Sequence, residues 1–410
     1  MAAQVGGETA DHNPVPQRAD AVPAYWSAVF AMTLCVFALI ASEFMPVSLL
    51  TPIAGALRIT EGMAGQGIAM SGAFAVLASL SISVLAAGVD RKTLLLGLTA
   101  LMGLSGVLVA MAPGYVTYMA GRALIGVVIG GFWSLSAAVA MRLVPQREVP
   151  RALAVFNGGN ALAMVLAAPL GAYLGAVIGW RGAFLCLVPV ALIALLWQWH
   201  SLPAMPVRKR PVAAGGARSV FGLLRRPVVR LGMLAVGGLF MGQFVLFTYV
   251  RPFLETVTQV DVTTLSLILL MTGVAGVVGT ALINAVLRQG FYRTLLGIPL
   301  LMAAIAVLLT ALGARTGVVV GLLGAWGLIA TAAPVGWWAW VARTLPEEAE
   351  AGGGLMVAVI QLSIALGATL GGLLFDSSGY QATFIASALI LVCAAALALL
   401  TARAASVVAA

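Results

Sequence analysis

A single carboxylate, Glu43, lies inside the apolar stretch SEFMPVSLLTP (42–52), and no other charged residue occurs between Asp20 and Arg58. A charged side chain at bilayer depth costs roughly 3 kcal/mol on insertion scales, so such residues usually face a cavity or a partner. Burial favours the protonated form of a carboxylate, whereas a nearby cation favours the ionised form. A carboxylate in this setting could therefore bind and release a proton.

A second intramembrane charge, Arg122, is the expected partner of Glu43. We take Trp26 as the anchor at the inner membrane face and Tyr115 as the anchor at the outer face. Glu43 lies 17 residues after Trp26, and Arg122 lies seven residues after Tyr115. At ~1.5 Å rise per helical residue, Glu43 lies ~25 Å from the inner face and Arg122 ~10 Å from the outer face, so both are at comparable depth on separate helices. We expect the two to approach one another or to share a polar cavity. One interpretation is that they couple proton binding to movement; the other is a static ion pair that joins two helices.

Amide side chains within the apolar stretches could bind a polar, uncharged solute. Asn157 and Asn160 are three residues apart and so share a helical face. Two matching prolines indicate a sequence repeat with an offset of 201 residues, and this offset makes Gln361 the counterpart of Asn160. Gln243 is a further amide. The alternative role for these amides is to join neighbouring helices by hydrogen bonds.

Tryptophans lie too deep in two apolar stretches to be obvious membrane-interface anchors. Trp133 is one, and Trp337, Trp338 and Trp340 form a group in which Trp337 and Trp340 share a face. Indole rings stack well on flat aromatic solutes. The other interpretation is that these rings pack against neighbouring helices or face lipid.

The elements that position these residues are membrane-spanning helices. The chain has 410 residues, of which 62% are hydrophobic and 9% charged, and a soluble protein could not bury that much apolar surface. Each crossing needs ~20 apolar residues, and cutting at charged and Gly/Pro-rich gaps predicts an all-α membrane protein. The twelve predicted helices are 25–51, 63–87, 94–112, 115–141, 152–176, 181–201, 229–254, 263–287, 293–314, 316–342, 353–375 and 380–402.

Basic residues between the predicted helices indicate the orientation. They concentrate in alternate gaps and in the long gap 203–228, so the positive-inside rule places both termini in the cytoplasm. The predicted organisation is a disordered cytoplasmic tail (1–24), a six-helix bundle (25–202), a basic cytoplasmic linker (203–228), a second six-helix bundle (229–402) and a cytoplasmic tail (403–410).

The two predicted bundles resemble each other in sequence. GAYLGAVIGWRGAF (171–184) recurs as GGLLFDSSGYQATF (371–384), with matching glycines and aromatic residues 200 positions apart. Because six helices is an even number, both copies enter the membrane from the same side. This pattern predicts two bundles related by a pseudo-twofold axis along the membrane normal.

Several motifs resemble those of the major facilitator superfamily. GVDRKTLLLG (88–97) is similar to its gating-loop motif in Asp90, Arg91 and Lys92, although the acidic residue of the first half of that motif is absent. GRALIGVVIGG (121–131) is similar to the motif whose arginine, here Arg122, the family associates with proton coupling. AAPLGAYLG (167–175) is a weakened antiporter motif. Through SEFMPVSLLTPIA (42–54) the chain resembles the drug:proton antiporter group, and most of all the bacterial purine ribonucleoside efflux pumps.

The resemblance implies a proton-coupled antiporter in a bacterial inner membrane that exports purine ribonucleosides such as inosine and guanosine. Together with the reasoning from the residues above, we expect proton coupling by Glu43 and Arg122, with the amides and tryptophans as cargo contacts. The expected energy source is the proton gradient, without a cofactor or metal, and the expected state is a monomer. Export of drugs, sugars or other metabolites by the same fold is the alternative. An intramembrane enzyme is disfavoured because the chain has only two histidines and no clustered catalytic groups.

Overall fold

The computed structural model describes residues 24–85, 88–205 and 222–409, and within them all regular elements are helices. The predicted tail 1–23 and most of the predicted linker, 206–221, lie outside these residues. The N-terminal set comprises α1 (Trp26–Leu57), α2 (Glu61–Leu85), α3 (Arg91–Ala110), α4 (Tyr115–Leu143), the 3-10 turn η1 (Gln146–Glu148), α5 (Val149–Val177), α6 (Gly179–Leu185) and α7 (Leu187–Ser201). The C-terminal set comprises the turn η2 (Leu223–Arg225), α9 (Pro227–Phe247), α10 (Val250–Thr256), α11 (Val262–Gln289), α12 (Phe291–Leu312), α13 (Thr316–Thr344) and α14 (Ala349–Ala409).

Eleven helical stretches in the described residues are long and apolar enough to cross a membrane. The last, Ala351–Ser406, has 56 residues, or about 80 Å at helical rise, which is far more than the ~30 Å of one crossing. Gly379 interrupts it with a left-handed φ of 76°, so α14 comprises two crossings joined at this glycine. The prediction of an all-α protein with twelve crossings is therefore confirmed. α14 continues to Ala409, through residues that the sequence placed in a tail.

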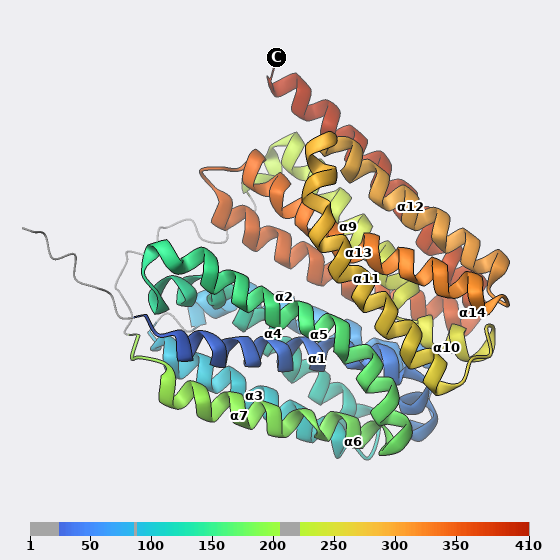
Figure 1. The fold of residues 1–410 in the computed structure, drawn as a ribbon, viewed down its shortest axis with the longest axis horizontal. Coiled ribbons are helices and arrows are strands. Elements are labelled where there is room, and N and C mark those ends of the chain that lie inside the picture. Colours follow the sequence, from blue (N-terminus) through green and yellow to red (C-terminus); the bar gives the residue numbers. More distant parts are fainter. Residues whose placement is uncertain (1–23, 86–87, 206–221, 410) are drawn as a thin grey trace, which may run out of the picture.

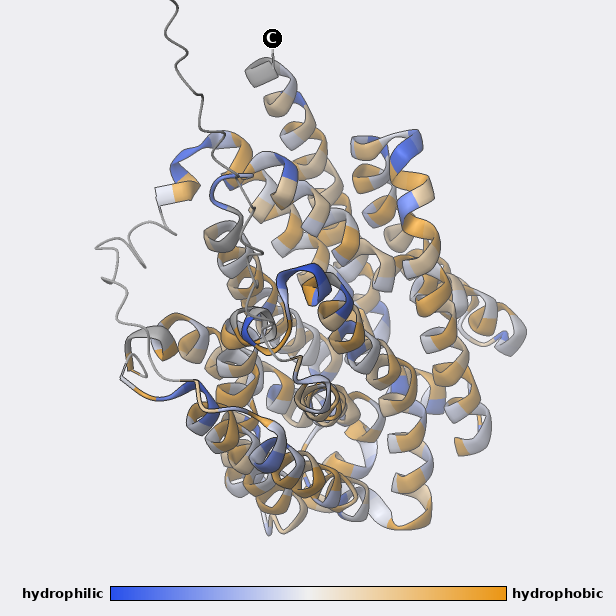
Figure 2. Cartoon of the chain, turned by 60° about the vertical axis from the view of Figure 1, so that its left-hand side comes forward, coloured by the Kyte–Doolittle hydropathy of each residue, from blue (hydrophilic) through white to orange (hydrophobic). Residues whose placement is uncertain are grey.

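The surface of the helices is apolar, as a lipid environment requires. Large side chains such as Leu77, Leu196 and Leu301 are 56–61% exposed, which water would penalise and lipid does not. Figure 2 shows hydrophobic residues along the helices and hydrophilic residues mainly at the connecting loops.

The first helix differs from its prediction because two prolines do not end it. α1 continues to Leu57, beyond the predicted end at 51, and both Pro46 and Pro52 lie inside it. Proline has no N–H, so the carbonyl four residues earlier loses its helical donor. In α1 these carbonyls belong to Ser42 and Ser48. Membrane helices tolerate such breaks where another group supplies the missing hydrogen bond.

The repeat seen in the sequence is also present in the local structure. Gly179 and Gly379 have φ values of 78° and 76°, a conformation that only glycine adopts readily. After each glycine, an aromatic pair packs edge to face, Trp180 with Phe184 at 6.4 Å and Tyr380 with Phe384 at 5.9 Å.

A second repeated contact lies near the start of each set. Trp26 donates a hydrogen bond to Glu148 at 3.0 Å, and Arg226, 200 positions after Trp26, forms an ion pair with Glu348 at 2.7 Å. The residue offset that superposes the two sets is therefore 200 at both ends of the repeat.

The two sets lie at an angle to one another (Figure 1). We call the end at which α1 and α9 begin the linker side, and the opposite end, where α1 ends, the far side. The sets meet around α10 on the far side and diverge toward the linker side. Hydrogen bonds that join the two sets extend from Glu43 and Gln361 to the far-side loops.

Candidate functional site

The carboxylate of Glu43 lies at the boundary between the two sets of helices. Its side chain on α1 is buried, with 5% of the residue exposed, and it accepts a hydrogen bond from Nε2 of Gln361 on α14 at 3.3 Å. The Oε1 atom of Gln361 has no hydrogen-bond partner among the described residues. One buried hydrogen bond between the sets thus depends directly on the carboxylate.

Arg122 is fully buried on α4 and contacts two neighbouring helices of its own set. Its guanidinium donates to the carbonyls of Ser42 at 2.8 Å and Glu43 at 3.2 Å, both on α1. It also donates to the carbonyl of Gly67 at 3.1 Å and the hydroxyl of Ser71 at 3.0 Å, both on α2. Arg122 therefore joins α4 to α1 and α2 through hydrogen bonds.

Pro46 explains why the carbonyl of Ser42 on α1 accepts a bond from Arg122. Pro46 cannot donate to the carbonyl of Ser42, and Nη1 of Arg122 supplies the missing donor. The expectation that Glu43 and Arg122 approach one another is met through the backbone of Glu43. The alternative of a static ion pair is wrong in its chemistry, because within the described residues Arg122 forms no ion pair and joins the helices through carbonyls.

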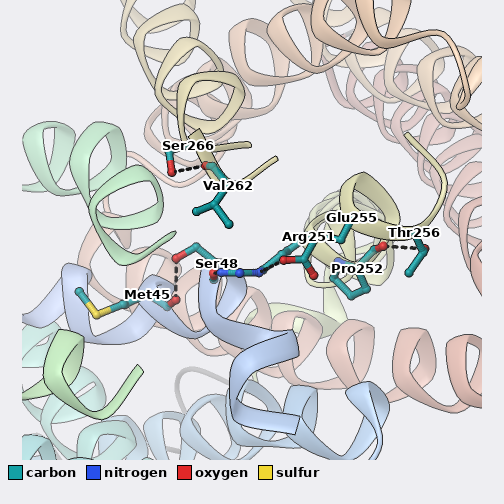
Figure 3. Close-up of polar contacts among 8 residues, drawn as sticks. All are labelled: Met45, Ser48, Arg251, Pro252, Glu255, Thr256, Val262 and Ser266. Carbon is teal, nitrogen blue, oxygen red and sulfur yellow. Dashed lines mark hydrogen bonds and ion pairs between the residues drawn. The ribbon is translucent and has the colours of Figure 1, made fainter. Parts of the chain in front are cut away.

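A second buried arginine, Arg251 on α10, performs the same task at the other proline. It is 4% exposed and donates from Nη1 to the carbonyl of Ser48, which Pro52 leaves without a helical donor. Its Nε atom pairs with Glu255 at 2.8 Å. Figure 3 shows the guanidinium lying between Ser48 and Glu255. Unlike the bonds of Arg122, this contact crosses from one set of helices to the other.

Further hydrogen bonds close the far side. Asp376, near the end of the first crossing of α14, accepts from the hydroxyl of Thr60 at 2.5 Å and from the backbone N–H of Gly62 at 2.9 Å. The second bond lies in the first turn of α2, where a carboxylate is favoured by the helix dipole. Thr369 donates to Gln66 at 3.1 Å, closer to the membrane centre.

The predicted amide contacts differ in their surroundings. Asn157 is exposed and donates to the carbonyl of Leu153 in its own helix at 3.0 Å, whereas Asn160 is half-buried. Gln243 is half-buried, and its Oε1 atom has no partner among the described residues. Of these four amides, all within the described residues, only Gln361 forms a hydrogen bond with Glu43.

The proposed symmetry between Asn160 and Gln361 is shifted by one residue. Gly171 of α5 packs against the carbonyl of Met45, and Gly371 of α14 packs against the carbonyl of Val245. Both members of this contact are 200 positions apart, so along α5 and α14 the counterpart of Gln361 is Ala161. The offset of 201 taken from two prolines holds elsewhere in the packed helices, at Gly126 and Gly327, but not for α5 and α14.

The two predicted stacking rings lie in unlike environments. Trp133 is half-buried beside Phe132, with the rings edge to face at 6.3 Å. Trp337 is 2% exposed in the core of the C-terminal set, edge to face with Trp340 at 5.6 Å. A solute cannot stack on Trp337 in this arrangement, because packed side chains cover its faces.

The predicted gating loop has a structural role at the linker side. Asp90 caps α3 by accepting from the backbone N–H groups of Lys92 at 2.8 Å and Thr93 at 3.3 Å. Its second oxygen accepts from the N–H of Met205 at 2.9 Å, and the N–H of Arg91 donates to the Met205 carbonyl at 3.3 Å. The loop thus holds the chain that follows α7.

Sequence reasoning missed Arg251 and Asp376 as site residues. Arg251 lies at the end of the predicted helix 229–254, and Asp376 follows the predicted helix 353–375 directly. The signal for Arg251 was its charge at the end of an apolar stretch, in FTYVRP (247–252). Nothing in the local sequence indicated that Asp376 meets α2.

Comparison with known proteins identifies relatives along almost the whole chain. The family model described as Major Facilitator Superfamily matches residues 32–356. The chain is 66% identical to the transcription regulatory protein OpdE of Pseudomonas aeruginosa, with 97% of each chain covered. It is 41% identical to the purine ribonucleoside efflux pump NepI of Salmonella typhimurium, over 88% of this chain and 90% of that one.

Solved structures share the fold at low sequence identity. A bacterial homologue of the human lysosomal transporter Spinster, inward-facing and unoccupied, superposes with a TM-score of 0.78 at 15% identity, over 93% of this chain and 98% of that one. The nucleoside transporter NupG superposes with a TM-score of 0.73 at 12% identity, over 91% and 99%.

Proposed function

Because this chain belongs to the major facilitator superfamily, we propose that it exports purine ribonucleosides, such as inosine and guanosine, in exchange for protons. The similarity to NepI supports this cargo. The multi-pass chain would lie in a bacterial inner membrane as a monomer, with both termini and the linker side in the cytoplasm. The far-side contacts then hold the carrier closed to the outside, so that cargo enters from the cytoplasm.

The observation that carries the proposal is the buried hydrogen bond from Gln361 to Glu43 across the two sets. Ionised Glu43 accepts from the amide nitrogen of Gln361. Protonated Glu43 becomes a donor, and the unpartnered Oε1 of Gln361 can accept from it after the amide turns over. Both protonation states can be satisfied, but by different bonds, so proton binding changes the contact that joins the sets.

The cargo would bind on the linker side of this contact. A purine base has donors and acceptors around its edge, which suits the amides of Asn157, Asn160 and Gln243 as well as Gln361, and its flat face suits Trp133. Trp337 would contact cargo only if the packing of its set changed. Asp90, Arg91 and Lys92 would act at the cytoplasmic end, holding the chain after α7.

The central experiment measures nucleoside-dependent proton flux in liposomes that contain the purified protein. Glu43→Gln introduces an amide that can still hydrogen-bond to Gln361 but cannot exchange a proton. We expect pH-gradient-driven inosine transport to fall at least 100-fold, while exchange of inosine for inosine continues. Glu347→Gln, at an exposed loop carboxylate, is the matched control. Undiminished pH-driven transport by Glu43→Gln would refute the coupling role.

Cargo is tested in the same liposomes without a pH gradient. Inosine, guanosine, adenosine, a sugar and a cationic dye are compared as competitors of inosine exchange. We expect the purine nucleosides to compete and the dye and sugar to leave exchange unchanged. Competition by the dye alone would support the alternative of multidrug export.

A second candidate function arises from the relative OpdE, whose name describes a transcription regulatory protein. We propose that any effect of this chain on transcription is indirect and follows from the cytoplasmic concentration of its cargo. Transcript levels compared between a deletion strain and one carrying Glu43→Gln test this proposal. Equal transcript levels in the two strains would support it. Restoration of the parent strain's transcript levels by the transport-deficient variant would instead indicate a regulatory role independent of transport.

A further inference from the structure

An apolar groove on the C-terminal set lies outside the site described above. It has a volume of about 530 Å³ and runs between α11, α12 and α13. Its walls include Leu282, Val286 and Leu301, which are 45–56% exposed, so the groove opens onto the lipid-facing surface. A volume of this size is typical of small-molecule sites.

The groove has the depth of one leaflet. Gly279 in α11 and Gly290, directly after α11, line its two ends, and eleven residues of helix span about 16 Å. One leaflet of the hydrocarbon core is about 15 Å thick. Because α11 ends and α12 begins on the linker side, the groove runs from the linker-side surface to the middle of the membrane.

The surface end of the groove is polar and positively charged. Arg293 and Thr294 line it at the start of α12. Arg288, in the last turn of α11, is exposed close by in the sequence, and Arg343 lies 4.0 Å over the ring of Phe291. No carboxylate lines the groove, and Arg293 forms no ion pair among the described residues.

We propose that this groove binds one anionic phospholipid of the linker-side leaflet. An acyl chain would occupy the apolar part between α11 and α12, and the phosphate would lie at Arg293, with Arg288 nearby. Basic sites between membrane helices on this side are suited to anionic headgroups. The lipid would stabilise the packing of α12 on α11 and α13, independently of the cargo that the carrier transports.

The groove offers a substitution that fills it without disturbing the fold. A side chain added at Gly297, which lines the groove, meets no atom within 4 Å. Gly297→Leu would therefore occupy the space of the acyl chain. Gly321 on α13 is equally open but lies outside the groove toward the far side, so Gly321→Leu is the matched control.

Native mass spectrometry of the delipidated, detergent-solubilised protein tests the proposal, with phosphatidylglycerol, phosphatidylethanolamine and phosphatidylcholine added separately. We expect one tightly retained phosphatidylglycerol per chain, at least tenfold weaker retention in Gly297→Leu, and unchanged retention in Gly321→Leu. Arg293→Gln should reduce the preference for phosphatidylglycerol at least fivefold. Glycerol phosphate should not compete with the lipid.

Three results would overturn the proposal. Equal retention of phosphatidylglycerol by the parent and Gly297→Leu would exclude the groove as the site. Equal retention of phosphatidylglycerol and phosphatidylcholine would exclude recognition of the charge, and displacement by glycerol phosphate would exclude the acyl chain. Far-ultraviolet circular dichroism of each variant separates loss of binding from loss of folding. Arg293 is exposed, so Arg293→Gln is expected to fold like the parent.

Discussion

Arg122 and Arg251 provide the same chemistry at two places on one helix. Each buried guanidinium donates to a carbonyl of α1 that a proline four residues later leaves without a helical donor. They differ in where they come from: Arg122 lies on α4 of the same set, and Arg251 lies on α10 of the other set. The first contact can persist through a transport cycle, whereas the second must break when the far side opens.

The difference separates stability from conformational preference. A bond within one set contributes to folding in every state of the carrier. A bond between sets contributes only to the state in which the far side is closed, so its loss shifts a population. The two arginines therefore allow the two effects to be measured with matched substitutions.

The largest effect on stability is expected for Arg122→Leu. It leaves the carbonyl of Ser42 and the hydroxyl of Ser71 without the donor they have now, and unsatisfied buried groups cost about 1–3 kcal/mol each. We expect the free energy of unfolding to fall by about 3 kcal/mol, measured as a lower unfolding temperature in detergent. A variant as stable as the parent would mean that the arginine does not hold the N-terminal set together.

Arg251→Leu is expected to change the conformational equilibrium more than the stability. A hydrogen bond from a charged donor contributes about 1.5–3 kcal/mol, so the population open on the far side should rise about tenfold or more.

The measurement is the distance between spin labels at Gly55→Cys and Gly317→Cys, exposed far-side positions in different sets where an added side chain meets no atom. The exposed native cysteines Cys186 and Cys393 are first replaced by serine. Arg315→Leu, at an exposed arginine of the same side, is the control. An unchanged distance distribution in Arg251→Leu would show that this bond does not hold the far side closed.

Pro52→Ala sharpens the comparison by changing the acceptor instead of the donor. Alanine restores an N–H that can bond to the Ser48 carbonyl within α1, so Arg251 loses its advantage there. We expect a shift of about fivefold toward the far-side-open state, from about 1 kcal/mol. Combined with Arg251→Leu it should add little, because both substitutions remove one interaction. Additive shifts would show that proline and arginine act separately.

Asp376→Asn is expected to have the smallest effect on the same equilibrium. Thr60 and Gly62 donate to different oxygens of Asp376. Asparagine keeps one oxygen that can accept from the N–H of Gly62, and its amide nitrogen can donate to the Thr60 hydroxyl, but it loses the charge near the start of α2. Such a charge at a helix N-terminus is worth about 0.3–1 kcal/mol, which corresponds to a two- to fivefold change in the far-side-open population measured by the spin labels. A shift larger than that of Arg251→Leu would reverse the order of the two contacts.

Local signals were sufficient for most of the fold. Apolar stretches long enough to cross a bilayer, interrupted by charged and glycine-containing gaps, predicted the crossings to within a few residues. The exceptions were the end of α1 and the end of α14. At Pro52 the sequence suggested a stop, but the helix continues because an arginine far along the chain replaces the missing donor.

The site could be predicted only in part. Glu43 and Arg122 were identified because charge in an apolar stretch is costly wherever the chain folds. The geometry of their contact could not be predicted, because the hydrogen-bonding capacity of a guanidinium does not determine whether it will bond to a side chain or to a backbone carbonyl. The amide symmetry failed by one residue because the repeat offset is 201 between α4 and α13 but 200 between α5 and α14, which carry the two amides.

The sequence by itself determined that the helices lie in a lipid bilayer, how many times the chain crosses it, and that the crossings repeat. Hydropathy and a 200-residue spacing are properties of the chain alone. Only the tertiary structure decided which distant groups donate hydrogen bonds to the carboxylate and carbonyl acceptors of α1. Gln361 lies 318 positions from Glu43, and Arg251 lies 203 positions from Ser48. Contacts over such separations arise from the packing of two bundles, and the local sequence around one partner does not predict the other.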